Sequence, residues 1–164
     1  MVPSSSALLP IRPSERSPDL GRRYAAKSEC AQAFFLPPAP KTKYRAVVVD
    51  DNRDAAESFA RLLTTMDCEA TFVTDAGDAL AEVLDKNPQI VFLDIGMPEI
   101  DGYQLASMVR RFFSSEEVKL VAVTGYGTAE DRARARWAGF DAHVLKPIDP
   151  ALVESMIKTV IEGG

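Results

Sequence analysis

The chain has 164 residues, 46% of them hydrophobic, which suits one compact core and leaves no room for a second sizeable domain. Its charge is uneven, because residues 1–43 hold seven Lys and Arg against three Asp and Glu, whereas residues 44–164 hold 12 against 21. An acidic body lacks the basic surface that binds phosphate backbones, so we expect no nucleic-acid partner for it.

No apolar run approaches the roughly 18 to 20 residues that cross a bilayer, so no membrane partner is expected. The N-terminus lacks the basic start of a secretory signal, and Pro10 interrupts its short apolar patch. We therefore expect a cytoplasmic protein in which Cys30 and Cys68 are reduced thiols, since two cysteines offer neither a disulfide framework nor metal-ligand spacing.

Residues 1–42 differ in composition from the rest of the chain. Seven of the 11 prolines lie in the first 40 residues, among several serines, and no helical or strand periodicity is sustained there. This composition predicts a flexible segment, in which only the patch Ala33–Leu36 suggests a short strand before a Pro-rich linker. Residues 43–164 are predicted to form one domain.

Short apolar runs alternate with amphipathic stretches from Tyr44 onward, which is typical of strands buried on both faces with helices between them. In chain order, the first predicted elements are a strand at Arg45–Val49, a helix at about Arg53–Met66, a strand near Ala70–Val73, a helix that Asp75 caps and that runs to about Lys86, and a strand at Ile90–Leu93.

The second half of this pattern repeats the same alternation. It predicts a helix at roughly Tyr103–Phe113, a strand at Lys119–Val123, a helix from a Thr128 cap to Gly139, a strand at Ala142–Leu145, and a helix from Asp149 and Pro150 to near Glu162. Right-handed crossovers turn such a chain into an α/β fold with a doubly wound parallel sheet, whose ligand site lies at the carboxyl ends of the strands.

Polar side chains follow four of the five predicted strands. These residues are Asp50 and Asp51 after the first strand, Asp94 after the third, Thr124 after the fourth and Lys146 after the fifth. Three carboxylates, a hydroxyl and an ammonium group are therefore expected to converge at one edge of the sheet.

Converging carboxylates raise one another's pKa unless a cation neutralises them. Oxygen ligands and waters suit Mg²⁺, which also accepts phosphate oxygens. Lys146 and Thr124 then supply a positive charge and a hydrogen-bond donor for a phosphoryl group. Asp94 is the expected nucleophile, because an aspartate can form an acyl phosphate and this one lies between the other strand ends.

Each of these residues also has an ordinary explanation. Asp50 and Asp51 could cap a helix, Asp94 could end a strand, Thr124 could belong to a turn, and Lys146 could be a solvated loop residue. The joint occurrence of all of them at strand ends favours a site.

The sequence lacks the signatures of two other classes of protein. A haloacid-dehalogenase-like phosphatase needs a second aspartate two residues after the nucleophile, where this chain has Gly96. A dinucleotide-binding domain needs a Gly-rich turn after the first strand, where this chain has Asp-Asp-Asn.

The segments VVVDDN, IVFLDIGMPEIDGYQLA, AVTGYG and GFDAHVLKP resemble, in this order, the characteristic blocks of bacterial response-regulator receiver domains. The resemblance covers residues 44–163 and implies a flavodoxin-like fold with strand order 2-1-3-4-5. It also implies roles for individual residues: a magnesium site made by Asp51, Asp94, the carbonyl of Gly96 and, partly through water, Asp50; phosphoryl contacts from Thr124 and Lys146; and a cis peptide between Lys146 and Pro147.

The function that the resemblance implies is two-component signal transduction. A phosphohistidine of a histidine kinase or phosphotransfer protein would phosphorylate Asp94, and the domain would switch a protein-binding surface rather than act as an enzyme. The GYG turn and GFDAHVLKP resemble stand-alone receivers and the C-terminal receivers of hybrid histidine kinases. A receiver severed from a hybrid kinase and a phosphorylation-independent flavodoxin-like binding module remain alternatives.

The expected output surface consists of the helix after Thr128, the strand Ala142–Leu145 and the last helix. His143 stands where the family usually has a Tyr or Phe that follows Thr124 inward, so it is either a switch residue or an ordinary strand residue. On the helix after Thr128, Trp137 lies opposite Ala135. It is therefore either a solvent-facing aromatic suited to binding or a buried one.

Overall fold

The computed structural model describes residues 44–162, so the predicted patch Ala33–Leu36 lies outside the described residues. The strands are β1 (Tyr44–Val49), β2 (Cys68–Val73), β3 (Ile90–Asp94), β4 (Lys119–Thr124) and β5 (Ala142–Leu145). The helices are α1 (Arg53–Thr64), α2 (Ala76–Lys86), α3 (Gly102–Val109), α4 (Ala129–Ala138) and α5 (Pro150–Glu162).

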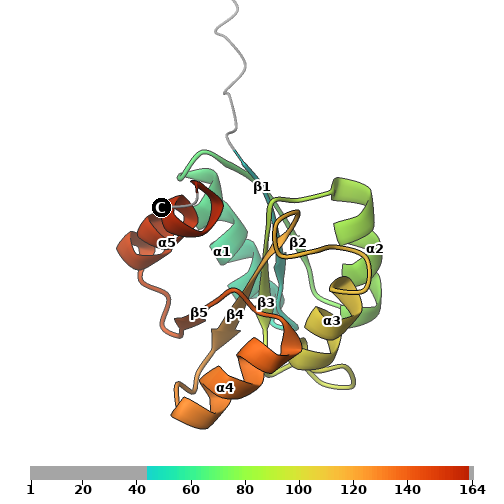
Figure 1. Ribbon diagram of the computed structural model, residues 1–164. Coiled ribbons are helices and arrows are strands. Elements are labelled where there is room, and N and C mark those ends of the chain that lie inside the picture. Colours follow the sequence, from blue (N-terminus) through green and yellow to red (C-terminus); the bar gives the residue numbers. More distant parts are fainter. Residues whose placement is uncertain (1–43, 163–164) are drawn as a thin grey trace, which may run out of the picture. The chain divides into compact units, whose positions relative to one another are not determined.

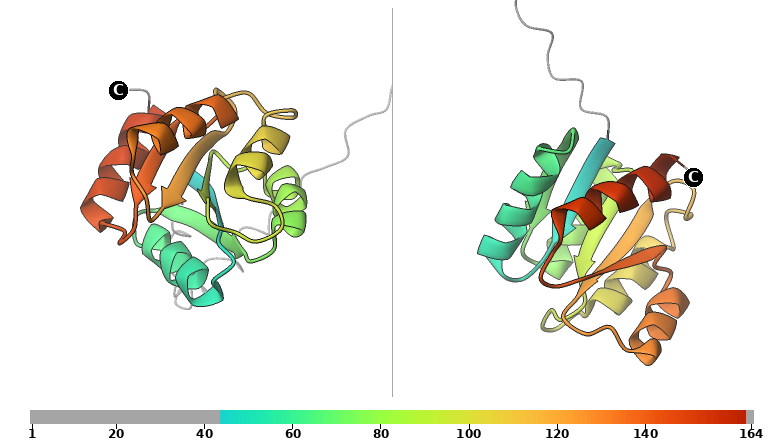
Figure 2. Two further views of the ribbon diagram at one scale, coloured as in Figure 1. Left: turned by 90° about the horizontal axis from the view of Figure 1, so that it is seen from below. Right: turned by 90° about the vertical axis from the view of Figure 1, so that its left-hand side faces the viewer.

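The five strands form one parallel sheet in the order β2-β1-β3-β4-β5 (Figure 1), which confirms the predicted doubly wound fold. Helices α1 and α5 cover one face of the sheet, and α2, α3 and α4 lie on the other (Figure 2). All five residues of the central strand β3 are buried. Helices on both faces leave a parallel sheet no solvent-facing side, which is why its strands are nearly continuous apolar runs.

The predicted helix ends are confirmed where a residue type determines them. Asp75 accepts hydrogen bonds from the first turn of α2, and Thr128 forms a reciprocal capping box with Asp131 at the start of α4. Gly139 ends α4 with a φ of 99°, in the left-handed region that glycine adopts without strain. Asp149 accepts from the backbone of Ala151 at the start of α5.

Three predicted boundaries are wrong by two residues or more. β2 begins at Cys68 rather than Ala70, because Cys68 and Glu69 pair with the first two residues of β1. α1 ends at Thr64 rather than Met66, since Asp67 takes a φ of 60° to start that strand. α3 ends at Val109 rather than Phe113, because the next residues form tight turns in which Phe112 donates to the carbonyl of Val109.

Within residues 44–162, every helix is too short or too polar to span a lipid bilayer.

Candidate functional site

The carboxyl ends of β1, β3 and β5 bring three of the predicted side chains into contact. The ammonium group of Lys146 lies 2.8 Å from Oδ2 of Asp50 and 3.2 Å from Oδ1 of Asp94. Parallel register explains the meeting, because Val49 pairs with Leu93 and the two aspartates follow at the same level of the sheet.

Asp51 completes a cluster of three carboxylates whose oxygens lie within 4.8 Å of one another. Asp50 and Asp94 are 5% and 7% exposed, whereas Asp51 is open to solvent. Among the ion pairs of residues 44–162, only Lys146 reaches these carboxylates, so the cluster keeps a net negative charge. A set of oxygen ligands with excess negative charge, open on one side, can hold a hard divalent cation.

The pKa of Lys146 reflects two opposing effects. Burial lowers this pKa, but the hydrogen bond to Asp50 and the negative charges of Asp94 and Asp50 outweigh burial, so the pKa lies above its ordinary value. Lys146 is therefore a permanent cation at neutral pH.

Backbone hydrogen bonds fix the loops that carry these residues. Oδ1 of Asp50 accepts from the backbone N–H of Asn52 at 2.9 Å, and the N–H of Lys146 donates to the carbonyl of Thr124 at 2.8 Å. The Lys146–Pro147 peptide is cis, as the resemblance implied.

Thr124 ends β4 beside the cluster and is 8% exposed. Its hydroxyl donates to the carbonyl of Tyr126 and accepts from the N–H of the same residue, both at 3.0 Å. The threonine is thus engaged in a local turn and must exchange this partner before it can bond a ligand. A Cβ atom at Gly125 would meet nothing within 4 Å, so this side of the site is open.

Gly96 lies next to the central carboxylate, since a Cβ atom built on it would be 3.6 Å from Oδ2 of Asp94. His143 is not part of the cluster. His143 lies on β5 and pairs with Ala122 of β4, two residues before Leu145 pairs with Thr124. Its side chain is exposed. It borders a hollow of about 170 Å³ together with Arg132 and Arg136 of α4.

One residue of the site was missed in the sequence. Gly102, the first residue of α3, packs so closely that an added Cβ atom would lie 2.5 Å from the carbonyl oxygen of Asp94. The sequence did contain a signal for the special role of this position. Glycine is a poor helix former, yet Gly102 stands directly after Asp101, which caps α3.

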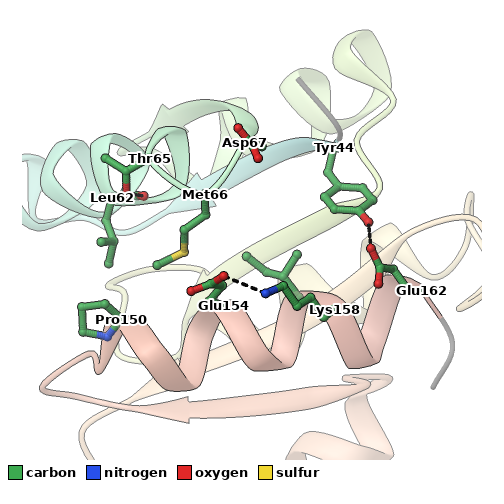
Figure 3. A pocket seen from close by; sticks show the side chains of 10 residues that line it. Tyr44, Leu62, Thr65, Met66, Asp67, Pro150, Glu154, Lys158 and Glu162 are labelled. Atoms are coloured by element: carbon green, nitrogen blue, oxygen red, sulfur yellow. Dashed lines mark hydrogen bonds and ion pairs between the residues drawn. The ribbon is translucent and has the colours of Figure 1, made fainter. Parts of the chain in front are cut away.

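Two grooves run along the face formed by α1 and α5. The first, of about 460 Å³, starts at Asp50 and Lys146 and is bordered by Phe59, Leu62 and Ile148. The second, of about 350 Å³, lies farther along, between Met66 and α5 (Figure 3). Glu154 and Lys158 pair on its α5 side, and it contains no member of the acidic cluster. Leu62 lines both grooves, so they form one continuous face that begins at the site.

The two possibilities for Trp137 are resolved. Ala135 of α4 is 6% exposed and belongs to the core, whereas Trp137 is 91% exposed on the outer side of the helix. The tryptophan borders a hollow of about 380 Å³ with Ala133 and Arg136.

Comparison with known proteins agrees with this geometry. The family model for the response regulator receiver domain matches residues 46–158. Over 114 residues, 70% of the chain, the sequence is 28% identical to Protein PilG of Pseudomonas aeruginosa, and the match spans 84% of that protein. It is 32% identical over 126 residues, 73% of the chain, to hybrid signal transduction histidine kinase L of Dictyostelium discoideum, of which the match spans only 7%.

Among solved structures, the fold resembles a CheY-like response regulator receiver domain protein from Methanospirillum hungatei. The TM-score is 0.64 and the sequence identity 27%, over 72% of this chain and 94% of that one. The chain belongs to the response regulator receiver domain family. It therefore carries a signalling domain of two-component systems rather than an enzyme in the ordinary sense. Such domains interact with histidine kinases or phosphotransfer proteins and with downstream effectors.

Proposed function

We propose that Asp94 accepts a phosphoryl group from a phosphohistidine of a histidine kinase or phosphotransfer protein, and that Mg²⁺ is held by Asp50, Asp51, Asp94 and the backbone carbonyl of Gly96. The observation that carries this proposal is the position of the Lys146 ammonium, 3.2 Å from a nearly buried Asp94 at the end of the central strand. A carboxylate beside a fixed cation and two further carboxylates suits phosphoryl chemistry better than a structural role.

The metal fits the residues present, because three carboxylates against one ammonium leave negative charge that a divalent cation offsets. When bound, Mg²⁺ would neutralise the cluster and polarise the phosphoryl oxygens. Asp50 and Asp94 are held by Lys146 until then, so the cluster stays assembled.

The chain's own residues carry the transfer. A carboxylate oxygen of Asp94 attacks phosphorus, the P–N bond of the phosphohistidine breaks, its electron pair returns to the imidazole, and an acyl phosphate forms. Lys146 stabilises the phosphoryl charge, and the Thr124 hydroxyl leaves the carbonyl of Tyr126 to donate to a phosphoryl oxygen. The domain thereby assists only its own phosphorylation and dephosphorylation.

Acid-labile labelling tests the proposal directly. Acetyl phosphate or a phosphorylated kinase with Mg²⁺ should label one site, and Asp94→Asn should abolish the label. The control Asp85→Asn, on the exposed side of α2, should keep it. Full labelling of Asp94→Asn, or labelling that persists in excess EDTA, would contradict the proposal.

The donor should dock on the α1 side of the site. The first groove begins at Asp50 and Lys146, and Lys146 contacts Asp94, so we expect a protein that delivers a phosphoryl group to Asp94 to cover this groove. Ser58 is an exposed residue of this groove. Ser58→Arg should slow transfer from a phosphorylated kinase while leaving labelling by acetyl phosphate intact. Equal slowing with both donors would mean that the variant damages the chemistry instead.

The output surface proposed is α4, β5 and α5, with Trp137 as its aromatic anchor and Thr124 and His143 as the switch. Trp137 is the most exposed large hydrophobic residue of the described chain and stands beside Arg136, and aromatic and arginine side chains are enriched in binding hot spots. We propose that this domain spans residues 43–164 of a cytoplasmic protein, with residues 1–42 outside it.

A further inference from the structure

The start of α3 rests directly on the backbone of the proposed phosphoacceptor. A Cβ atom on Gly102 would lie 2.5 Å from the carbonyl oxygen of Asp94 and 2.9 Å from Cα of Ile95, closer than a Cβ atom can approach. The N–H of Gly102 also points to the carbonyl of Ile95 at 3.4 Å. Contact this close leaves no space to absorb a shift of the Asp94 peptide.

Arg134 of α4 holds the two residues that flank this glycine. Its guanidinium lies 3.5 Å from the carboxylate of Asp101 and stacks over the ring of Tyr103, 4.2 Å from the centroid. Asp101 caps α3 by accepting from the N–H of Gln104. Tyr103 is 8% exposed, so its position is set by the core and not by solvent.

The far ends of the same two helices are also joined. Arg110, just after α3, donates to the carbonyl of Gly139, just after α4, at 2.8 Å. The helices lie side by side on one face of the sheet (Figure 1). Two attachments, one at each end of α3, favour movement of α3 and α4 as one body.

We propose that the start of α3 is a positioning element that couples Asp94 to α4 through Arg134, on a path separate from Thr124 and His143. This coupling rests on the proposed function, because phosphorylation of Asp94 supplies the displacement. The displacement passes from the Asp94 peptide to Gly102, then through Asp101 and Tyr103 to Arg134. Trp137 lies three residues farther along α4, on its exposed face.

Arg134→Gln in the full chain tests the path. The Arg134 side chain is 66% exposed, so its loss should cost little stability, and none of the proposed metal or phosphoryl contacts is altered. With Mg²⁺ and saturating beryllofluoride as the phosphoryl mimic, we expect the NMR shift of the Trp137 indole to fall to about half or less of the wild-type shift, while beryllofluoride affinity changes by less than about threefold. Arg111→Gln, the same change at an exposed arginine just after α3, should keep the full shift.

Gly102→Ala tests the contact itself. The added carbon must push α3 off the Asp94 backbone, so beryllofluoride affinity should fall by about tenfold or more, because a misplaced carboxylate loses oriented contacts. A urea titration of the same variant reports whether it folds, and the Arg134→Gln result decides the proposal if it does not.

The outcomes separate the two proposals. A full Trp137 shift in Arg134→Gln, or wild-type beryllofluoride affinity in a folded Gly102→Ala, would overturn the coupling and leave the phosphoacceptor site standing. A wild-type chain that does not bind beryllofluoride would instead overturn the proposed function, and the coupling with it.

Discussion

Lys146 donates a 2.8 Å hydrogen bond to Asp50, so the ammonium group occupies the carboxylate cluster from the side of β5. The lysine therefore competes with a metal ion for the same negative charge, although it acts on the phosphoryl group during transfer. Lys146→Ala should bind Mg²⁺ at least as tightly as the wild type, while labelling by acetyl phosphate slows by about 100-fold or more. Calorimetric titration with Mg²⁺ measures the first effect. A tenfold loss of Mg²⁺ affinity would contradict this role, and Lys86→Ala is the matched control.

Arg110 is a structural arginine whose loss should be costly. It donates to the carbonyls of Gly139 and Val118, both at 2.8 Å, and pairs with Asp141 at 2.6 Å, with both side chains largely buried. Arg110→Met keeps the aliphatic volume but leaves these acceptors unpaired, so the free energy of unfolding should fall by about 2–4 kcal/mol. Urea denaturation measures this change in the free energy of unfolding. Arg111→Met, on the exposed neighbour, should change it by less than about 0.5 kcal/mol.

Thr71 in β2 differs from Arg110 in the hydrogen bonding of its polar group. Within the described residues, its buried hydroxyl is a side-chain oxygen without a hydrogen-bond partner. Thr71→Val keeps the branched shape and removes the unpaired hydroxyl, so it should be neutral or stabilise by about 1 kcal/mol. Thr71→Ser keeps the hydroxyl, loses the methyl group and should destabilise. A clear loss of stability in the valine variant would show that the hydroxyl has a partner.

The thiol of Cys68 should make stability depend on alkaline pH. Burial, with a smaller contribution from the charge of Asp67, raises the pKa of this fully buried thiol. The unfolded chain ionises Cys68 at about pH 8.5, whereas the native state keeps the proton, so this contribution is complete below about pH 8.5 and is lost as pH rises toward the native pKa. The difference in urea midpoint between the wild type and Cys68→Ala should shrink between about pH 7 and pH 9.5. A constant difference would show that the thiol titrates equally in both states.

Residues 1–42 should be dispensable for folding and phosphorylation, because a Pro- and Ser-rich segment buries too little apolar surface to offset the entropy of ordering it. A chain that starts at Lys43 should melt within about 2 °C of the full chain. A large loss on truncation would indicate that the patch Ala33–Leu36 packs on the domain.

The sequence predicted what depends on local pattern plus the rule that parallel strands end at one edge. Each apolar run marked a strand, and Asp50, Asp94 and Lys146 come together because they follow three of these runs. The start of β2 could not be predicted, since Cys68 joins the strand only through pairing with Tyr44. The same holds for Arg110, because its partners Val118, Gly139 and Asp141 lie 8 to 31 residues along the chain.

The orientation of helix α4 could not be predicted from the sequence, for a different reason. Alanines lie on both of its sides, so hydrophobic periodicity does not decide which side faces the sheet, and Trp137 could be placed only once the packing of Ala135 was known. The special role of Gly102 could have been noticed in the sequence, but only its close contact with the Asp94 backbone explains why a glycine is needed at this position.

The position of each strand in the sheet also divides the domain by how readily it opens. β3 is central, buried along its whole length and paired on both sides, so its amide protons should exchange with solvent only when the entire domain unfolds. β5 is a four-residue edge strand with one paired side, and two of its residues are exposed. Asp94 is thus anchored in the part of the fold that opens last, whereas His143 and Leu145 lie in a part that can rearrange at little cost in free energy.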